Sequence, residues 1–335
     1  MNSIKKISFV FILILCIFAF SSCTRTMRGK DIPVNEDSNV GSKRTGLLNK
    51  DLSEADKGKS DKEDADQVDT DKKEADQGGI IVEQGITVSE QVLLDQDGIK
   101  ITLKGFDPNG DAFGPTLKVL VENNRNEPIT VQTINTVING VMQVTYLFCD
   151  VPSGERVNDE IRMMQTDLDK AGIKIIKDIE LEFHIRNTDT WDIILNSEPI
   201  YITTTADPSY VQKYDDSGFL ALEEKGIKIV IKKDNTEDYL GSMYVNLYVE
   251  NNTDEDIFIQ AKDVSVNGVK IDPWFSSYVL AGKKAYDSMQ FFRSDLEENG
   301  IKAIKEIELV FHIINGNTYK TILDSDVIYV NFEEQ

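Results

Sequence analysis

The sequence predicts an all-β fold, in which two antiparallel β-sandwiches follow one another after a signal peptide and a disordered linker. Three observations predict it. Apolar and polar residues alternate with the period of a strand, turn-forming residues recur about every 10 to 15 residues, and the second half of the chain repeats the first. The chain has 335 residues, 40% of them hydrophobic, which is enough for two domain cores.

Residues 1–22 have the organisation of an export signal. Lys5 and Lys6 precede an almost wholly apolar stretch, residues 7–20, which is shorter than the roughly 20 residues that a membrane-spanning helix needs. The sequence Phe20-Ser21-Ser22-Cys23 then resembles the bacterial lipobox, although Phe20 stands where leucine is usual. This resemblance implies that Cys23 carries diacylglycerol and palmitate and begins the mature chain. An uncleaved anchor, or a secretory signal with an incidental cysteine, is the alternative.

Residues 23–85 are predicted to form a lipidated N-terminus and a disordered acidic linker. Polar and charged residues dominate from residue 24 onward, no aromatic residue occurs, and the sequence of residues 61–67 is echoed at 71–77. Such a composition cannot bury enough apolar surface to offset its conformational entropy. We expect a solvated spacer, with a charged docking tail as the alternative reading.

Residues 86–205 and 206–335 are predicted to be two copies of one domain. An offset of 128 residues aligns them without a gap over a long stretch: residues 172–185 (GIKIIKDIELEFHI) match residues 300–313 (GIKAIKEIELVFHI). The motif VENN likewise occurs at Val121 and at Val249. Such self-similarity indicates a tandem duplication. The polar run around residues 205–216 is expected to be a short connection.

Each copy is predicted to contain about eight short strands. The clearest is at residues 179–186, where the apolar side chains of Ile179, Leu181, Phe183 and Ile185 alternate with polar ones and so define a buried face. One helical turn is expected in each copy, at residues 166–171 and 294–299, capped by Thr166 or Ser294 and ended by glycine. The strands of the first copy are expected at residues 86–94, 98–106, 116–123, 128–138, 141–150, 156–164, 176–186 and 191–204.

The order of these motifs resembles a known family. A DGIKI strand, the VENN turn, a strand ending in Asn-Gly and the IELEFHI strand together are similar to the immunoglobulin-like domains of unknown function on Gram-positive surface lipoproteins. The resemblance covers about residues 86–332 and implies immunoglobulin-like topology for both copies. The shared motifs are structural, so it implies no catalytic residue.

Composition argues against several classes of function. Thirty-six basic and 58 acidic residues give a formal charge of −22, which would repel a nucleic-acid backbone. Two histidines and three cysteines leave little material for a metal site or a His-centred catalytic triad. The hydrolase, phosphate-loop and zinc-protease motifs are absent from the sequence. We therefore expect no enzyme, no cofactor and no metal.

Three isolated features have a chemical and a structural reading. Cys149 lies in an apolar run and is expected to pack in the core rather than act as a redox thiol. His184 and His312 occupy equivalent positions, where alternation predicts solvent-facing side chains rather than metal ligands. The loop that begins at Asp107-Pro108-Asn109-Gly110 is expected to be a hairpin turn, because Lys118 stands where a calcium loop would have its bidentate glutamate.

Aromatic residues concentrate in the second copy. Between residues 272 and 286 the sequence contains Trp274, Phe275, Tyr278 and Tyr286, which the first copy echoes only partly, for example at Tyr146. Exposed aromatics near a turn can stack on sugars or pack on a protein partner. These four residues are the candidate binding site, with core packing as the alternative.

The sequence as a whole favours a lipid-anchored lipoprotein on the extracytoplasmic face of the cell membrane. Its partners would be membrane lipid, through acylated Cys23, and possibly an envelope protein or glycan at the cell surface. The two copies would serve as a non-enzymatic binding or spacer module, and duplication would raise avidity if each copy binds weakly. An envelope enzyme acting on wall polymers and a purely structural role are the alternatives.

Overall fold

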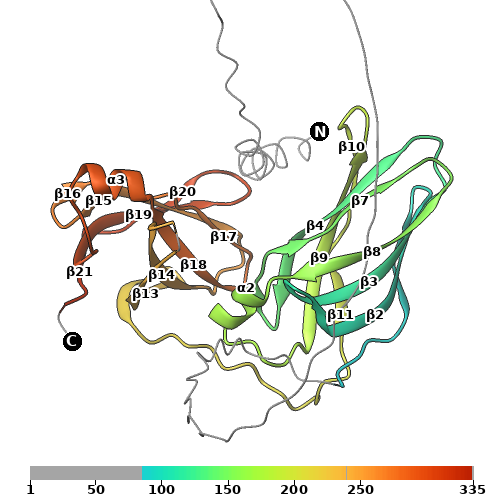
Figure 1. Cartoon of the computed structure of the whole chain (residues 1–335), viewed down its shortest axis with the longest axis horizontal. Coiled ribbons are helices and arrows are strands. Elements are labelled where there is room, and N and C mark those ends of the chain that lie inside the picture. Colours follow the sequence, from blue (N-terminus) through green and yellow to red (C-terminus); the bar gives the residue numbers. More distant parts are fainter. Residues whose placement is uncertain (1–84, 239, 334–335) are drawn as a thin grey trace, which may run out of the picture. The chain divides into compact units, whose positions relative to one another are not determined.

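The computed structural model describes residues 85–238 and 240–333, so the signal peptide, Cys23 and nearly all of the predicted linker lie outside the described residues. Where the chain is described, it forms mainly antiparallel sheets and two short helices (Figure 1). The predicted all-β class is confirmed. None of the described helices is long and apolar enough to cross a membrane.

Two sheets form the first copy. One has the strand order β1-β2-β3-β8-β6, and the other contains β10-β9-β4-β5, with β7 paired to β4 and β11 paired to β9. Figure 1 shows β2, β3 and β8 side by side. The strands are β1 (Gln91–Gln96), β2 (Ile99–Asp111), β3 (Gly114–Asn123), β4 (Ile129–Ile138), β5 (Val141–Met142), β6 (Thr145–Tyr146), β7 (Phe148–Val151), β8 (Arg156–Met163), β9 (Asp178–Asn187), β10 (Ile193–Asn196) and β11 (Ile200–Thr203).

The second copy repeats this arrangement. The strands β12, β13, β14 and β18 form one layer, and β16-β15-β19-β20 form the other, with β17 paired to β15 and β21 paired to β19. The strands are β12 (Phe219–Glu224), β13 (Ile227–Glu237), β14 (Met243–Asn251), β15 (Ile257–Val266), β16 (Val269–Lys270), β17 (Ser277–Val279), β18 (Lys284–Phe291), β19 (Glu306–Asn315), β20 (Thr321–Asp324) and β21 (Ile328–Asn331).

Each sandwich has its own hydrophobic core. The first core draws on residues from Leu94 to Ile202, and the second on residues from Ile227 to Val330. The alternating face predicted on β9 is buried, and the equivalent face of β19 is buried too. Each fully buried aliphatic or phenylalanine side chain contributes about 1.5–3 kcal/mol relative to an exposed one, so this alternation largely fixes which face of each strand turns inward.

The helices occur where expected but begin differently. They are α2 (Gln165–Lys170) and α3 (Arg293–Glu298). The prediction that Thr166 and Ser294 cap them is wrong, because each helix starts directly after its strand and both residues lie inside the first turn. The capping positions are Met164 and Phe292, which make no side-chain capping bond.

The predicted glycine ends of the helices are confirmed. Gly172 has φ 63° and Gly300 has φ 69°, a left-handed conformation that glycine adopts without steric cost. The amide of Ile173 then bonds to the carbonyl of Leu168 at 2.9 Å, which satisfies a helix-end carbonyl as in a Schellman motif.

Several predicted strands of the first copy differ in extent, among them β2, which continues to Asp111 instead of ending at residue 106. β1 begins at Gln91, and the residues before it instead contact the chain beyond β11, where Thr87 and Thr205 bond through the backbone at 2.8 Å. The apolar run at 141–150 divides into β5, β6 and β7, and the run at 191–204 divides into β10 and β11 with Pro199 between them. Proline has no amide hydrogen for a sheet ladder, so it commonly falls outside paired strands.

The connection between β11 and β12 contains no strand and is held by side chains. The Tyr214 hydroxyl donates to the carbonyl of Asn139 at 2.9 Å, and the amide of Asn139's side chain contacts Gln212. One parallel bridge, between Val141 of β5 and Lys284 of β18, brings strands of both copies into a ten-stranded sheet.

Candidate functional site

The predicted lipidation site, Cys23, lies outside the described residues. The four aromatic candidates of the second copy lie within the described residues, but their side chains differ in exposure and in the residues that they contact. No ring contact joins any two of these four within the described part of the chain. They therefore do not form one aromatic patch.

Trp274 is the most exposed of the four, with half of its surface open to solvent. Its backbone pairs with Gln290 of β18, with the Trp274 amide donating at 2.8 Å. The first copy places Tyr146 in the same register opposite Arg162, and Tyr146 is 48% exposed. The duplication has thus kept an outward aromatic residue at this position in both copies.

Phe275 and Tyr278 have structural contacts. The Phe275 ring lies 6.5 Å from the ring of Phe311 in the second core. The Tyr278 hydroxyl donates to Asp256 at 3.0 Å, and burial raises the pKa of Tyr278 well above its usual range. For these two residues the structure shows packing against the rest of the domain, which is the alternative to a binding role.

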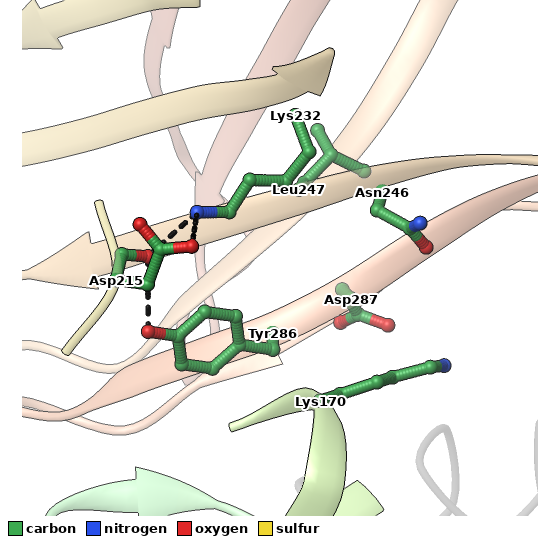
Figure 2. A pocket seen from close by; sticks show the side chains of 7 residues that line it. All are labelled: Lys170, Asp215, Lys232, Asn246, Leu247, Tyr286 and Asp287. Atoms are coloured by element: carbon green, nitrogen blue, oxygen red, sulfur yellow. Dashed lines mark hydrogen bonds and ion pairs between the residues drawn. The ribbon is translucent and has the colours of Figure 1, made fainter. Parts of the chain in front are cut away.

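Tyr286 lies in a small cavity of about 140 Å³, which we call the junction cavity (Figure 2). Its ring packs on Tyr248 with centroids 4.9 Å apart, and its hydroxyl donates to the carbonyl of Asp215 at 3.0 Å. Burial raises the pKa of Tyr286 to about 12. The hydroxyl therefore stays protonated and keeps donating at neutral pH.

Lys232 fixes the connecting segment at the edge of this cavity. Its ammonium donates to the carbonyls of Asp215 at 2.7 Å and Ser217 at 3.0 Å, and it lies 3.1 Å from the Asp215 carboxylate. Hydrogen bonds from Ser217, with the neighbouring Lys232, lower the pKa of Asp215 to about 2. These groups hold the backbone of the connecting segment in place. No sequence pattern indicated this arrangement.

The remaining wall of the junction cavity carries a second acid and a second base. Figure 2 shows Asp287 and the ammonium of Lys170 on the side away from Asp215. Lys170 approaches the Ser288 hydroxyl at 3.5 Å, and Ser288 in turn donates to Asn246 at 2.8 Å. Burial raises the pKa of Asp287. Acidic and basic side chains thus both line the cavity, and they already interact with other residues of the chain.

Both histidines have a side-chain partner twelve residues further along. His184 Nδ1 lies 2.5 Å from Asn196 Oδ1, and His312 Nδ1 lies 2.6 Å from Asp324 Oδ1. The expectation that both are solvated is wrong for His184, which is 1% exposed, and His312 is only partly exposed, with 16% of its side chain open to solvent. The cross-strand neighbours Gln132 and Asn196 flank His184 on either side, so a side chain on the outer face of the sheet is nevertheless covered. Burial lowers the pKa of His184.

The prediction for Cys149 is confirmed, whereas the predicted turn at residues 107–110 is displaced: these residues belong to β2, and the turn of the hairpin is at Ala112 and Phe113. The residues after Asp107 lie in the β2–β3 hairpin, where the Asp107 carboxylate accepts the amides of Asn109 and Gly110, each at 3.1 Å. Cys149 is buried in the first core, and burial raises the pKa of its thiol to about 12. In the described residues no three His, Cys, Asp or Glu side chains are placed to hold a metal ion.

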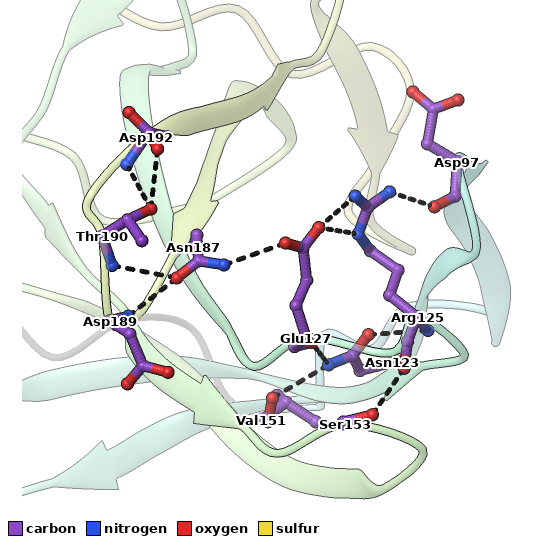
Figure 3. A network of polar contacts seen from close by, with 10 residues as sticks. All are labelled: Asp97, Asn123, Arg125, Glu127, Val151, Ser153, Asn187, Asp189, Thr190 and Asp192. Carbon is purple, nitrogen blue, oxygen red and sulfur yellow. Dashed lines mark hydrogen bonds and ion pairs between the residues drawn. The ribbon is translucent and has the colours of Figure 1, made fainter.

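The VENN motifs have a structural explanation. In the first copy the buried Asn123 side-chain amide donates to the carbonyls of Glu127, Val151 and Pro152 at 2.9–3.1 Å (Figure 3). Asn251 makes the equivalent three bonds in the second copy at 2.8–3.0 Å. We call this side chain the asparagine staple.

The network around the first staple extends to neighbouring turns. Figure 3 shows the Glu127 carboxylate between Arg125 and Asn187, and Asn187 in turn accepts the amides of Asp189 and Thr190. These contacts tie together the turns at one end of the sandwich. The motif that carries the family resemblance is therefore architectural.

Comparisons with known proteins identify no family. No family model matches the chain, and no curated protein matches it. Among solved structures, the chain is similar to the SafA pilin–SafB chaperone complex of Salmonella enterica, with 11% identity, a TM-score of 0.19, and coverage of 64% of this chain and 88% of that one. The YadV chaperone gives 13% identity and a TM-score of 0.20, with coverage of 70% and 98%.

An enzyme is also among the similar structures. For the exo-chitosanase CsxA of Amycolatopsis orientalis, the identity is 10% and the TM-score 0.20, with coverage of 64% of this chain and 25% of that one. At such TM-scores these likenesses carry no argument about function.

Proposed function

We propose that the protein is a bacterial surface lipoprotein, held on the extracytoplasmic face of the cell membrane by diacylglycerol on Cys23. Its two immunoglobulin-like sandwiches act there as a non-enzymatic binding or spacer module. The observation that carries the proposal is the N-terminal order of basic residues, a short apolar run and Phe20-Ser21-Ser22-Cys23.

The anchoring chemistry fits a stable attachment. A buried methylene contributes about 0.8 kcal/mol, and one acyl chain alone binds a membrane only marginally, whereas a diacylglyceryl group supplies two. Residues 24–85 then have the polar, low-complexity composition of a spacer. The proposal thus assigns a role to each part of the sequence, from the anchor to the duplicated body.

The proposal of a non-enzymatic module is supported by the structural roles of the polar groups and the thiol described above. The most elaborate polar groups, at the asparagine staples and at Lys232, bond mainly to backbone carbonyls and so support turns and connections. The thiol of Cys149 is buried and protonated at neutral pH. An envelope enzyme remains the competing hypothesis, and an activity screen on wall polymers separates the two, because the binding reading predicts no turnover.

Metabolic labelling tests the anchor. Cells expressing the full chain are grown with an alkyne analogue of palmitate, and the purified protein is examined for the incorporated label. We expect labelling of the natural chain and of a Cys149→Ala variant, and loss of label in Cys23→Ala. A Cys23→Ala chain that is labelled as strongly as the natural one, or a natural chain without label, contradicts the proposal.

A further inference from the structure

The second copy has an open seam between the edges of its two sheets. β12 is the last strand of one sheet and pairs only with β13 among the described strands, while β21 pairs only with β19. A groove of about 370 Å³ runs between them, lined by all of β12 and by residues 325–329. We call it the seam groove. Unpaired strand edges of this kind offer backbone donors and acceptors to an incoming strand.

In the first copy the equivalent strands β1 and β11 also have one described partner strand each, but the segments next to them are joined to each other by hydrogen bonds. There the amide of Thr87 donates to the Thr205 hydroxyl, and the Thr205 amide donates to the Thr87 carbonyl, both at 2.8 Å. The offset of 128 residues places Asp215 and Glu333 at these two positions in the second copy. Asp215 bonds to Lys232, and Glu333 bonds to Lys305, so neither bridges the second seam.

Residue differences between the copies also favour an open second seam. Pro199, which cannot donate to a strand, becomes Val327, and Gln91 becomes Phe219. Val327 is 64% exposed and Leu220 is 51% exposed. An edge with exposed apolar side chains and no proline is one that proteins normally protect.

The charges around the groove select the partner's chemistry. Glu223, Glu224 and Asp326 contribute carboxylates to the lining, and no lysine or arginine is among the described residues that line it. The cation that follows β12 in the chain, Lys225, donates to the carbonyl of Ile322 at 2.7 Å. Lys228 is the cross-strand neighbour of Glu223, but it already pairs with Asp216 at 2.6 Å. A strand entering here therefore meets apolar side chains and more carboxylates than cations.

We infer that the seam groove is a docking site for an extended segment of a partner protein, in which apolar residues alternate with lysine or arginine. The segment adds to the free edge of β12 as a strand. Its backbone bonds to β12, its apolar side chains continue the inward face that carries Phe219 and Leu222, and its cations lie on the opposite face, beside Glu223. This inference rests on the proposed binding role and specifies the partner for it.

The test uses the full chain in detergent and a capped hexapeptide of alternating valine and lysine, which matches the six residues of β12. Binding is measured by fluorescence anisotropy at low salt. We expect saturable binding, and weakening by at least about tenfold when glutamate replaces lysine or when alternate peptide amides are N-methylated. A glutamate or N-methylated peptide that binds equally well overturns the inference, as does the absence of binding by the valine–lysine peptide.

Matched variants locate the site. Val327→Pro introduces the proline that the first copy has at the equivalent position. The local backbone is the same in both copies, because the serine two residues earlier, Ser197 or Ser325, accepts the amide of a phenylalanine at 2.8–2.9 Å in each. Phe219→Asp places a charge on the inward face that the apolar side chains of the segment would cover. Each should weaken binding at least about tenfold, with an unchanged circular dichroism spectrum.

The first copy supplies the control. Gln91 corresponds to Phe219 and is exposed, so Gln91→Asp should leave binding unchanged. Equal loss in Gln91→Asp, or full binding in both second-copy variants, overturns the inference. Concentration-dependent dimers that Phe219→Asp abolishes would show a second copy of the chain in the groove, and would also overturn it. None of these results alters lipid labelling at Cys23, so failure here is distinguishable from failure of the proposed anchor.

Discussion

The asparagine staple gives the most quantitative prediction. Asn123→Ala removes the donor to three backbone carbonyls, those of Glu127, Val151 and Pro152, and also the acceptor of the Arg125 amide, which bonds to Asn123 Oδ1 at 3.0 Å. A hydrogen bond contributes about 1 kcal/mol net, and a buried polar group left unpaired costs about 1–3 kcal/mol. We therefore expect a loss of about 2–4 kcal/mol in the free energy of unfolding of the first copy.

The neighbouring residue of the same motif is a matched control. Asn124 is exposed, and its backbone amide donates to the Gly98 carbonyl at 2.8 Å, a bond that alanine preserves. Asn124→Ala should change the free energy of unfolding by less than about 0.5 kcal/mol. The assay is urea unfolding followed by circular dichroism, with Asn251→Ala as the equivalent variant of the second copy. If Asn123→Ala and Asn124→Ala unfold at the same urea concentration, the structural reading of VENN is wrong.

Three further predictions concern titration and packing. Because burial raises the pKa of the Cys149 thiol to about 12, Ellman's reagent at pH 8 should react with it only after denaturant is added, and fast reaction in the native protein would contradict its burial. Burial lowers the pKa of His184 in the folded chain, so as pH drops below about 6.5 the unfolded chain takes up this proton first and the free energy of unfolding falls. His184→Gln should therefore reduce the fall in urea midpoint between pH 7 and 5. An unchanged fall would argue against a role for His184 in it. Trp274→Ala should cost less than about 1 kcal/mol. Tyr278→Ala deletes a partly buried ring and its bond to Asp256, and should cost about 1.5–3 kcal/mol; equal thermal shifts would refute this contrast.

Local periodicity predicted much of the fold. The alternation in β9 and its repeat in β19 follow from the two-residue period of a strand. The helix ends at Gly172 and Gly300 follow from the ease with which glycine adopts a left-handed backbone conformation. These are properties of single segments, so one sequence suffices to find them. Duplication strengthened the prediction because each element was visible twice.

Contacts between segments far apart in the chain were not predictable in the same way. His184 lies on the outer face, as alternation requires, yet its burial depends on cross-strand neighbours that no local pattern identifies. Tyr286 was singled out as an aromatic residue, but its bond to Asp215 joins segments 71 residues apart. The replacement of Pro199 by Val327 is visible when the two copies are aligned. Only the structure shows that Val327 lies beside β12 and lines the seam groove.

Intact-mass spectrometry of the protein extracted from cell membranes tests the central claim most directly. The account predicts a chain that begins at Cys23 and exceeds the mass of residues 23–335 by at least a diacylglyceryl group, with the extra mass located on the N-terminal peptide. A chain that retains residues 1–22, or one that begins elsewhere and carries no lipid, would contradict it.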